Sequence, residues 1–296
     1  MQDRVLWNLT GGRVLGPAPF FVVGIVNVTP DSFFDGGHHD LALDAVAHGL
    51  RLIREGAMVL DVGGESTRPY AKAVSAEQEL ARVLPVIQGL CSGIRAEGDE
   101  VAVSVDTYKA EVAAAALQAG ASIVNDISAC QFDPAMIDVL AQYKPGYVLM
   151  HSPGRPGRMQ DAPRYANVVD EIIAFFEKHI RLLTAAGLPE DNIVIDPGIG
   201  FGKTLEHNLQ ILSSIEAFGT LGLPLFVGLS NKSMFGKLLG LEVDDRKNAT
   251  QAAIAVLASR GVRVHRVHDV ALTMQTLTVA EAMRPGRRVL EAKGEL

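Results

Sequence analysis

The stretch VAVSVDT, residues 101–107, shows the pattern that decides the fold: the apolar run of a buried strand closed by polar side chains. Seven other stretches repeat this pattern, and consecutive stretches are separated by segments with the apolar spacing of amphipathic helices. Runs of Val, Ile and Leu are expected of parallel strands that are buried on both faces. Eight strand and helix units predict an α/β fold, a (β/α)8 TIM barrel. The other stretches are FVVGIVNVT (21–29), MVLDVGGEST (58–67), IVND (123–126), YVLMH (147–151), IVIDPG (193–198), LPLFVGLSNK (223–232) and VRVHRVHDV (262–270).

Polar side chains close each of these runs. In a (β/α)8 barrel the carboxyl ends of all eight strands open on one face, and that face carries the active site. An isolated Asp after a strand is as readily explained as the N-cap of the next helix. Helix capping does not explain why polar residues close one predicted strand after another, so the sequence predicts a functional site at this face.

Length and composition fit a single barrel domain over residues 1–296. The chain is 48% hydrophobic and 21% charged, and no linker rich in Ser, Gly or Pro divides it. A net charge of -7 argues against a nucleic-acid partner, which would require a basic surface. The two cysteines, Cys91 and Cys130, support neither a disulfide framework nor a metal cluster. No signal peptide or membrane span is recognisable, so we expect a cytoplasmic protein.

Periodicity also predicts the helices and an N-terminal addition. Two short apolar runs around Gly11 and Gly12 predict a β-hairpin at about residues 5–16, which would plug the amino end of the barrel. Ser75 and Gln78 have the spacing of a capping box at the start of the second helix. Helices are expected at residues 41–55, 75–95, 110–120, 133–142, 165–186, 207–218, 244–260 and 271–283.

The run DPGIGFGKT, residues 196–204, is similar in outline to a phosphate-binding P-loop. The P-loop spacing requires glycine at position 197, where this chain has proline, which has no N–H to donate to a phosphate. We therefore expect a structural role for Lys203.

Strings at the strand ends resemble those of the dihydropteroate synthases, in order and over almost the whole chain. The resemblance implies a transferase of folate biosynthesis. Such an enzyme joins 4-aminobenzoate to 6-hydroxymethyl-7,8-dihydropterin diphosphate, and it releases 7,8-dihydropteroate and diphosphate. The strings are NVTPDSF (27–33), DVGGESTRP (61–69), SVDT (104–107), NDI (125–127), LMH (149–151), MQ (159–160), DPGIGFGKT (196–204) and RVHDV (266–270).

A pterin has a flat edge rich in hydrogen-bond donors, which needs carboxylate and amide partners. The resemblance assigns this role to Asp106, Asn125 and Asp196, and buried partners of this kind reject analogues that lack the matching donors. Met150 is expected to contact the substrate. Lys232 is expected against the pterin, as a residue of both binding and catalysis.

The leaving diphosphate requires positive charge and hydrogen-bond donors. Arg266 and His268, two residues apart on the last strand, are expected to supply them from one side of that strand. Asn27 resembles the family's magnesium ligand, so Mg²⁺ is the expected cofactor, with diphosphate oxygens as further ligands.

By the same resemblance, 4-aminobenzoate binds beneath two long loops that follow the first and second strands. An aromatic amine is a weak nucleophile, so ionisation of the pterin carbon–oxygen bond is expected to precede its attack. Closed loops would keep water from the cation, and Asp35 and Arg68 are expected to shape the closed state as catalytic residues. The residues expected around the aminobenzoate are Thr67, Arg68, Pro69, Phe201 and Ser230.

The chain departs from the family's pattern in two places. Ser230-Asn231-Lys232 stands where Ser-Arg-Lys is usual, and DRKNATQAA (245–253) replaces the usual Gly-Ser pair before the seventh barrel helix. The first departure removes a cation near the aminobenzoate pocket. We expect weaker aminobenzoate binding or an altered response to analogues, with activity retained.

Two other functions stay open. A pterin-dependent barrel of the methyltransferase type would share Asp106, Asn125 and Asp196, but it has no need of residues 67–69 or of the pair Arg266 and His268. A non-catalytic pterin-binding paralogue is suggested by Asn231. The family resemblance also implies a homodimer formed through helices on the far side of the barrel.

Overall fold

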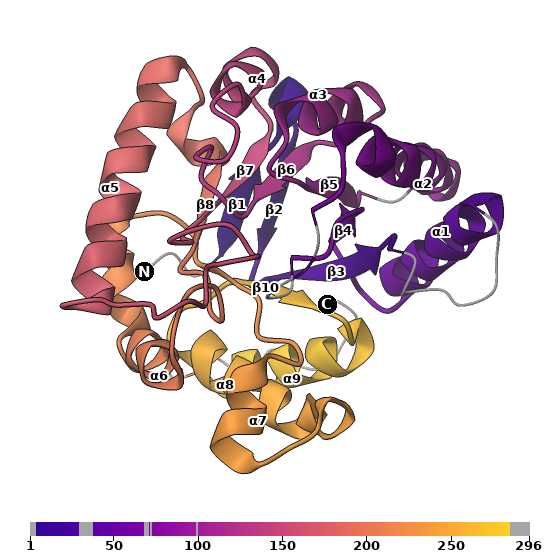
Figure 1. Cartoon of the computed structure of the whole chain (residues 1–296). Coiled ribbons are helices and arrows are strands. Elements are labelled where there is room, and N and C mark those ends of the chain that lie inside the picture. The colour runs from indigo at the N-terminus through magenta and orange to yellow at the C-terminus, as the bar shows by residue number, and fades with distance from the viewer. Residues whose placement is uncertain (1–3, 30–37, 68–70, 72, 99, 285–296) are drawn as a thin grey trace.

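The computed structural model describes residues 4–29, 38–67, 71, 73–98 and 100–284. Eight parallel strands form a cylinder inside a ring of helices (Figure 1). Neighbours follow the order β8-β7-β6-β5-β4-β3-β10-β9, and a bridge between Ile195 and Leu225 brings β8 to the start of β9. The predicted barrel is confirmed. Its strands are β3 (Phe21–Asn27), β4 (Val59–Gly63), β5 (Ala102–Asp106), β6 (Ile123–Asp126), β7 (Gly146–Met150), β8 (Ile193–Asp196), β9 (Phe226–Val227) and β10 (Val264–Val267).

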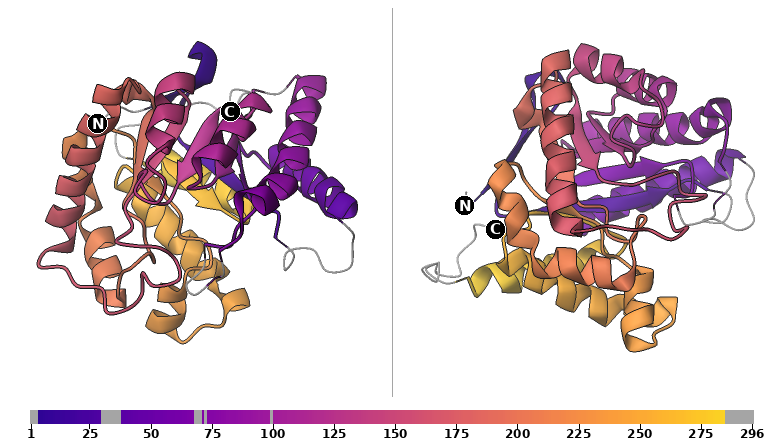
Figure 2. Two further views of the ribbon diagram at one scale, coloured as in Figure 1. Left: turned by 45° about the horizontal axis from the view of Figure 1, so that its top comes forward. Right: turned by 60° about the vertical axis from the view of Figure 1, so that its left-hand side comes forward.

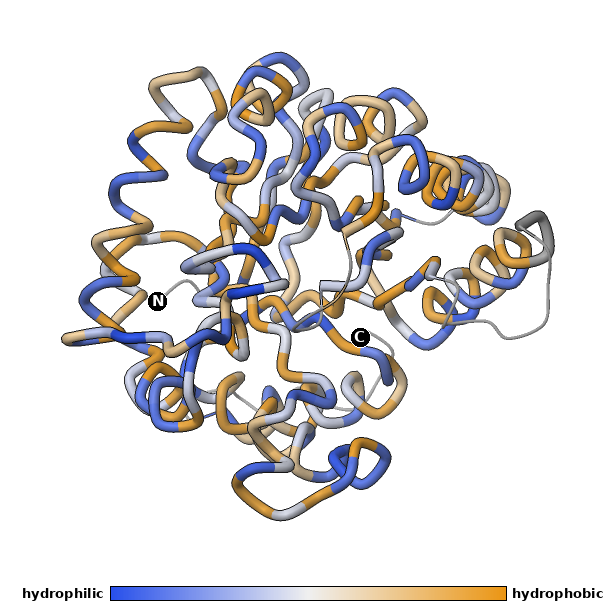
Figure 3. Tube along the Cα trace, viewed as in Figure 1, coloured by the Kyte–Doolittle hydropathy of each residue, from blue (hydrophilic) through white to orange (hydrophobic). Residues whose placement is uncertain are grey.

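The helices cover the cylinder with their apolar faces. Hydrophobic and hydrophilic residues alternate along α1, α2 and α5, as Figure 3 shows. The predicted capping box is present, because Ser75 Oγ accepts from the Gln78 N–H and the Gln78 side chain accepts from the Ser75 N–H. The helices are α1 (His38–Arg54), α2 (Ala76–Glu97), α3 (Ala110–Gln118), α4 (Met136–Tyr143), α5 (Val168–Ala186), α6 (Leu205–Ser213), α7 (Ser233–Leu239), α8 (Lys247–Ser259) and α9 (Val270–Ala282).

Two predicted helical segments differ from the structure, and one short helix was not predicted. The segment at 207–218 is divided into α6 and a 3-10 helix, η3 (Ile215–Leu221), and the segment at 244–260 starts as a 3-10 turn, η4 (Val243–Arg246). The side chain of Arg246 favours this 3-10 turn, since it donates to the carbonyls of Asn231, before α7, and Leu241, after it, and holds η4 against both ends of α7. Helix α7 was not predicted, because seven residues are too few for a periodic pattern.

The hairpin closes the amino end of the barrel, as predicted. It consists of β1 (Val5–Asn8) and β2 (Val14–Ala18), joined through a 3-10 turn, η1 (Thr10–Gly12), so it extends two residues beyond the predicted range. Trp7 is 1% exposed, and its Nε1 donates to the carbonyl of Asn192 at 2.8 Å. In the right-hand view of Figure 2 the hairpin lies on one side of the barrel. It packs on inward residues at the strand starts: Phe21, Val59, Ala102, Ile123, Val148, Val194, Phe226 and Val264.

Alternation along each strand divides the buried residues into two layers. Leu60, Val62, Val103 and Val105 point outward and join the cluster between strands and helices. Their neighbours point inward, and these inward positions change from apolar at the amino ends to polar at the carboxyl ends. None of the helices in the described ranges is long and apolar enough to cross a membrane.

Candidate active site

The inward positions at the carboxyl ends of neighbouring strands are in register. Gly63 lies beside Asp106, Asp106 beside Asn125, and Met150 beside Asp196. Residues two apart on a strand share a face, so Asp61 points inward with Gly63. The mouth of the barrel therefore collects side chains from strands far apart in the sequence: Asp61, Asp106, Asn125, Met150, Asp196 and Arg266.

Arg266 lies between two carboxylates at this mouth. Its Nε donates to Asp61 Oδ2 at 2.6 Å, and its Nη2 donates to Asp106 Oδ2 at 2.7 Å. Asn125 Nδ2 donates to the same oxygen of Asp61 at 2.9 Å. Asp61 is fully buried, and its Oδ1 accepts no hydrogen bond from the described residues. The network holds side chains of β4, β5, β6 and β10 in one arrangement.

Asp196 and Lys232 bring opposite charges to the same mouth. Burial raises the pKa of Asp196 to about 6, although its Oδ1 accepts from the Gly198 N–H at 2.8 Å. Burial lowers the pKa of Lys232 to about 8, and the charge of Asp196 opposes this shift. Burial likewise raises the pKa of Asp106 to about 7 against the effect of Arg266. Perturbed pKa values of this kind are typical of functional sites.

One wall of the mouth is apolar. Met150 clusters with Tyr108 and Ile127, and Phe132 and Phe201 pack against this cluster. The Nζ of Lys232 lies 4.3 Å from the centre of the Phe201 ring, within the range of a cation–π contact. The wall offers an apolar surface beside the polar groups.

Ser230 and His268 lie beyond the ends of β9 and β10. Ser230 Oγ accepts from the His268 N–H at 3.3 Å and lies 3.0 Å from His268 Nδ1. His268 is exposed at the rim, whereas the side chain of Arg266 is 21% exposed and is paired inside the barrel. The two residues predicted to bind diphosphate therefore occupy different surroundings.

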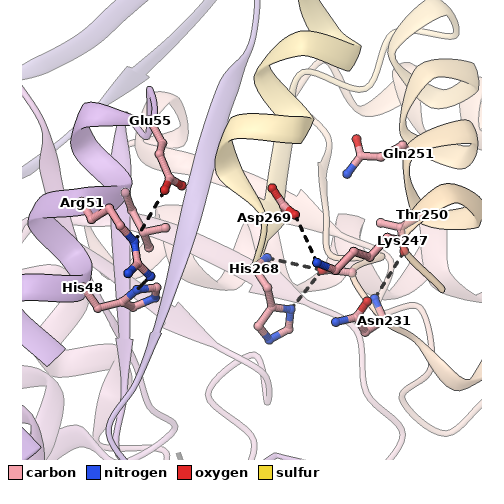
Figure 4. Close-up of a pocket in the computed structure, with 11 residues that line it drawn as sticks. His48, Arg51, Glu55, Asn231, Lys247, Thr250, Gln251, His268 and Asp269 are labelled. Atoms are coloured by element: carbon pink, nitrogen blue, oxygen red, sulfur yellow. Dashed lines mark hydrogen bonds and ion pairs between the residues drawn. The ribbon is translucent and has the colours of Figure 1, made fainter. Parts of the chain in front are cut away.

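Ser230 and His268 also line a pocket between α1 and α8 (Figure 4). Arg51 pairs with Glu55 across 3.5 Å on one side of it, and Lys247 lies 3.7 Å from Asp269 on the other. Asn231 lines the same pocket. Each cation of these pairs has an acid beside it, so the pairs give the pocket no net positive charge.

Lys203 has the structural position expected from the sequence. Its Nζ donates to the carbonyls of Gly198 at 2.9 Å, Phe201 at 3.0 Å and His151 at 3.3 Å, and it lies 3.0 Å from His151 Nδ1. Burial lowers the pKa of Lys203 to about 7, and burial also lowers the pKa of His151, which favours the neutral ring as acceptor. These contacts fix the segment that carries Phe201 against the end of β7.

Two features of the mouth are absent from the sequence-based prediction. Asp61 holds Asn125 and Arg266, and it was recognisable as a charged residue inside an apolar strand run, two residues before the end of β4. Lys109 pairs with Glu65 and with a carboxylate of α2. Those contacts join three distant segments, and no spacing in the sequence indicates them.

The remaining predicted residues lie at the edge of this mouth or outside the described ranges. Asn27 is the last residue of β3, beside Gly63, and Thr67 is half-buried. Asp35, Arg68 and Pro69 lie outside the described residues. The roles assigned to all of them stay predictions.

Fold and site define a (β/α)8 barrel whose mouth combines buried carboxylates, an amide, cations and an apolar wall. Residues 23–268 match the model of the pterin binding enzyme family. Dihydropteroate synthase of Escherichia coli K12 is 42% identical over 261 residues, 88% of this chain and 90% of that protein. The Bacillus subtilis enzyme is 40% identical, with 88% of each chain covered.

Solved structures agree with these matches. Dihydropteroate synthase from Xanthomonas albilineans with 4-aminobenzoic acid superposes with a TM-score of 0.85 at 44% identity, over 93% of this chain and 98% of that one. The enzyme from the same organism in complex with 7,8-dihydropteroate gives a TM-score of 0.81 at 42% identity, with the same coverage. This chain belongs to the dihydropteroate synthases, a family of pterin-binding transferases.

Proposed function

We propose that this chain condenses 6-hydroxymethyl-7,8-dihydropterin diphosphate with 4-aminobenzoate to give 7,8-dihydropteroate and diphosphate, in the cytoplasm. The observation that carries the proposal is the gathering of Asp106, Asn125, Asp196 and Lys232 at one mouth beside an apolar wall. The solved structures at 44% and 42% identity hold 4-aminobenzoic acid and 7,8-dihydropteroate, which supports the same substrate and product for this chain.

In this proposal the hydrogen-bonding edge of the pterin faces the polar groups, and the face of its ring lies against the apolar wall. Asp106 and Asp196 accept hydrogen bonds from its amine and ring N–H groups, and the Asn125 amide supplies both a donor and an acceptor. Met150 and Phe201 contact the ring, and Lys232 lies beside it. Leaving either buried carboxylate without its donor is costly, which makes the site selective for this edge.

The reaction breaks the bond between the pterin methylene carbon and the diphosphate oxygen. The oxygen keeps the electron pair, and the lone pair of the aromatic amine then forms the new carbon–nitrogen bond, after which the amine loses a proton to the departing anion or to water. Arg266 and His268 stabilise the charge that develops on the diphosphate.

Mg²⁺ is the proposed cofactor, and Asn27 its protein ligand. Among the described residues there is no group of three His, Cys, Asp or Glu side chains that could hold a metal. One amide oxygen from Asn27 fits an ion that keeps several waters and takes its other ligands from substrate phosphates. When bound, the ion would neutralise part of the charge of the leaving group.

Aminobenzoate is proposed to bind between Thr67, Arg68 and Pro69 on one side and Phe201 and Ser230 on the other. Exclusion of water protects the electrophilic pterin from hydrolysis. Asp35 and Arg68 are the proposed residues of this closed arrangement.

The test is an assay of diphosphate release with both substrates and Mg²⁺. We expect release that depends on aminobenzoate and a loss of kcat/KM for the pterin of about 100-fold in Asp196→Asn, with no change in Asp191→Asn, an exposed aspartate near the amino end of β8. A methyltransferase-type barrel or a non-catalytic paralogue would bind the pterin without aminobenzoate-dependent release, and that result would remove the proposal.

A homodimer is the proposed assembly. Exposed apolar side chains lie on α6 to α9 and at their ends, and α7, α8 and α9 are neighbours in Figure 1. Exposed apolar side chains on neighbouring helices support a protein partner at this side of the barrel. We expect the wild-type protein to sediment as a dimer. The double variant Val256→Glu with Val279→Glu should be a monomer, whereas Leu43→Glu, on α1, should remain a dimer. A monomeric wild type would contradict the proposed assembly. The side chains are Leu209, Leu238, Leu239, Val243, Val256, Val279 and Met283.

A further inference from the structure

Lys109 joins three segments that are far apart in the sequence. Its Nζ forms ion pairs with Glu65, after β4, and with Glu79, on α2. The hydroxyl of Tyr108 donates to the other oxygen of Glu65 at 2.8 Å. The exposed fractions of the side chains are 15% for Lys109, 7% for Glu65 and 1% for Glu79, so the ammonium faces carboxylates rather than water. We call these four residues the clamp.

The clamp is suited to fixing positions. A buried ion pair contributes little net stability against its cost of desolvation, but its partners are held in a defined geometry. Both oxygens of Glu65 are engaged, one by Lys109 and one by Tyr108. Glu65 is therefore held in place by two neighbouring residues of the segment that follows β5.

The clamp connects the two halves of the mouth. Lys109 comes three residues after Asp106, and Glu65 comes two residues before Thr67. The ring of Tyr108 belongs to the apolar wall with Met150, and Lys109 Nζ lies 4.5 Å from the centre of that ring. A displacement of Glu65 would therefore move the segment of Thr67 relative to the wall and to β5.

We propose that Lys109 is a positioning residue that, through Glu65, sets Thr67 relative to the bound pterin and so controls the affinity for 4-aminobenzoate. This inference rests on the proposed function. A preformed segment lowers the ordering cost that a small ligand would otherwise meet on binding. Affinity for the pterin is expected to depend much less on the clamp, because Asn125, Asp196 and Met150 are positioned by their own strands.

The experiment compares Lys109→Met, Lys109→Arg and Tyr108→Phe with the wild type. The matched control is Tyr143→Phe, which removes a hydroxyl that accepts from Gln118. Tyr143 lies at the end of α4, where its carbonyl accepts from Thr10 of the hairpin turn, remote from the mouth. The measurements are kcat, KM for aminobenzoate, and the Kd of the pterin diphosphate by calorimetry without aminobenzoate.

We expect KM for aminobenzoate to rise about tenfold in Lys109→Met and about threefold in Tyr108→Phe, with the pterin Kd within about twofold of the wild type. Lys109→Arg should recover most of the loss, and Tyr143→Phe should change nothing. The inference would be overturned if Lys109→Met weakened the affinity for both substrates equally, or if KM for aminobenzoate were unchanged in Tyr108→Phe. Tyr108→Phe decides the matter if Lys109→Met does not fold. Absence of aminobenzoate-dependent release in the wild type would instead refute the proposed function.

Discussion

Single side chains at the mouth show how burial adjusts charge to the reaction. Asp196 accepts most strongly from the pterin when it is ionised, and Lys232 must be protonated to act as a cation. Burial raises the pKa of Asp196 to about 6 and lowers the pKa of Lys232 to about 8. Both charges are present together only in the interval between these values.

The pH dependence of activity follows from these two groups and from Asp106, whose pKa burial raises to about 7. We expect kcat/KM for the pterin diphosphate to fall as the pH decreases from about 7 through about 6, because Asp106 and then Asp196 take up protons, and to fall as the pH rises through about 8, because Lys232 loses one. Steady-state rates from pH 5 to 10 measure both limbs. In Lys232→Arg the alkaline limb should move upward and the acid limb should stay. An identical alkaline limb in both proteins would exclude Lys232 as its source.

At the level of elements, the turn before α7 explains one departure from the family. Asn231 has a φ of 57°, in the left-handed region that asparagine adopts more readily than arginine, and its carbonyl accepts from Arg246. Asparagine therefore suits the backbone of this turn, while the charge that arginine would bring is missing.

Asn231→Arg tests the effect of that charge. We expect KM for aminobenzoate to fall about threefold, as for a partly exposed charge pair, and stability to fall by about 1 kcal/mol through backbone strain. Kinetics and thermal unfolding measure the two effects, and Asn231→Gly, which suits the same φ without a charge, is the control. An unchanged KM would show that the departure has no bearing on aminobenzoate.

The segment between β8 and α6 depends on Lys203. Lys203→Met removes a donor from the buried carbonyls of Gly198 and His151 and from the partly buried carbonyl of Phe201, and among the described residues only that of Gly198 keeps another donor, the Phe201 N–H. We expect the free energy of unfolding to fall by about 3 kcal/mol. Lys178→Met, an exposed position on α5, should change stability by less than about 0.5 kcal/mol. Chemical denaturation of the two variants measures this difference, and equal stabilities would contradict the structural role of Lys203.

Much of the fold and part of the mouth could be predicted from the sequence. Strand runs that end in Asp106, Asn125 and Asp196 indicate a barrel and its active face, because a parallel sheet buries both faces and period-two alternation then aims these residues inward. The pairing of Arg266 with Asp61 and the clamp around Lys109 depend on packing between distant segments, which periodicity does not encode. Helix α7 was missed because it is short.

For the molecule as a whole, the hairpin plug is the feature on which stability depends most visibly. Trp7→Ala opens a cavity among the strand starts, and we expect a loss of about 3–5 kcal/mol with kcat unchanged in the folded protein. Leu6→Ala, on the exposed face of the same strand, should be nearly neutral, since Leu6 is 50% exposed. Unfolding followed by circular dichroism compares them. A large loss of kcat in folded Trp7→Ala would mean that the two ends of the barrel are coupled.

Trp7 is the only tryptophan of the chain, and it lies at the end of the barrel opposite the mouth. Its fluorescence, excited selectively at the red edge of the absorption band, will therefore report the loss of the plug during denaturation. No substrate in the mouth touches this ring, so binding can alter the signal only at a distance, through energy transfer to the pterin.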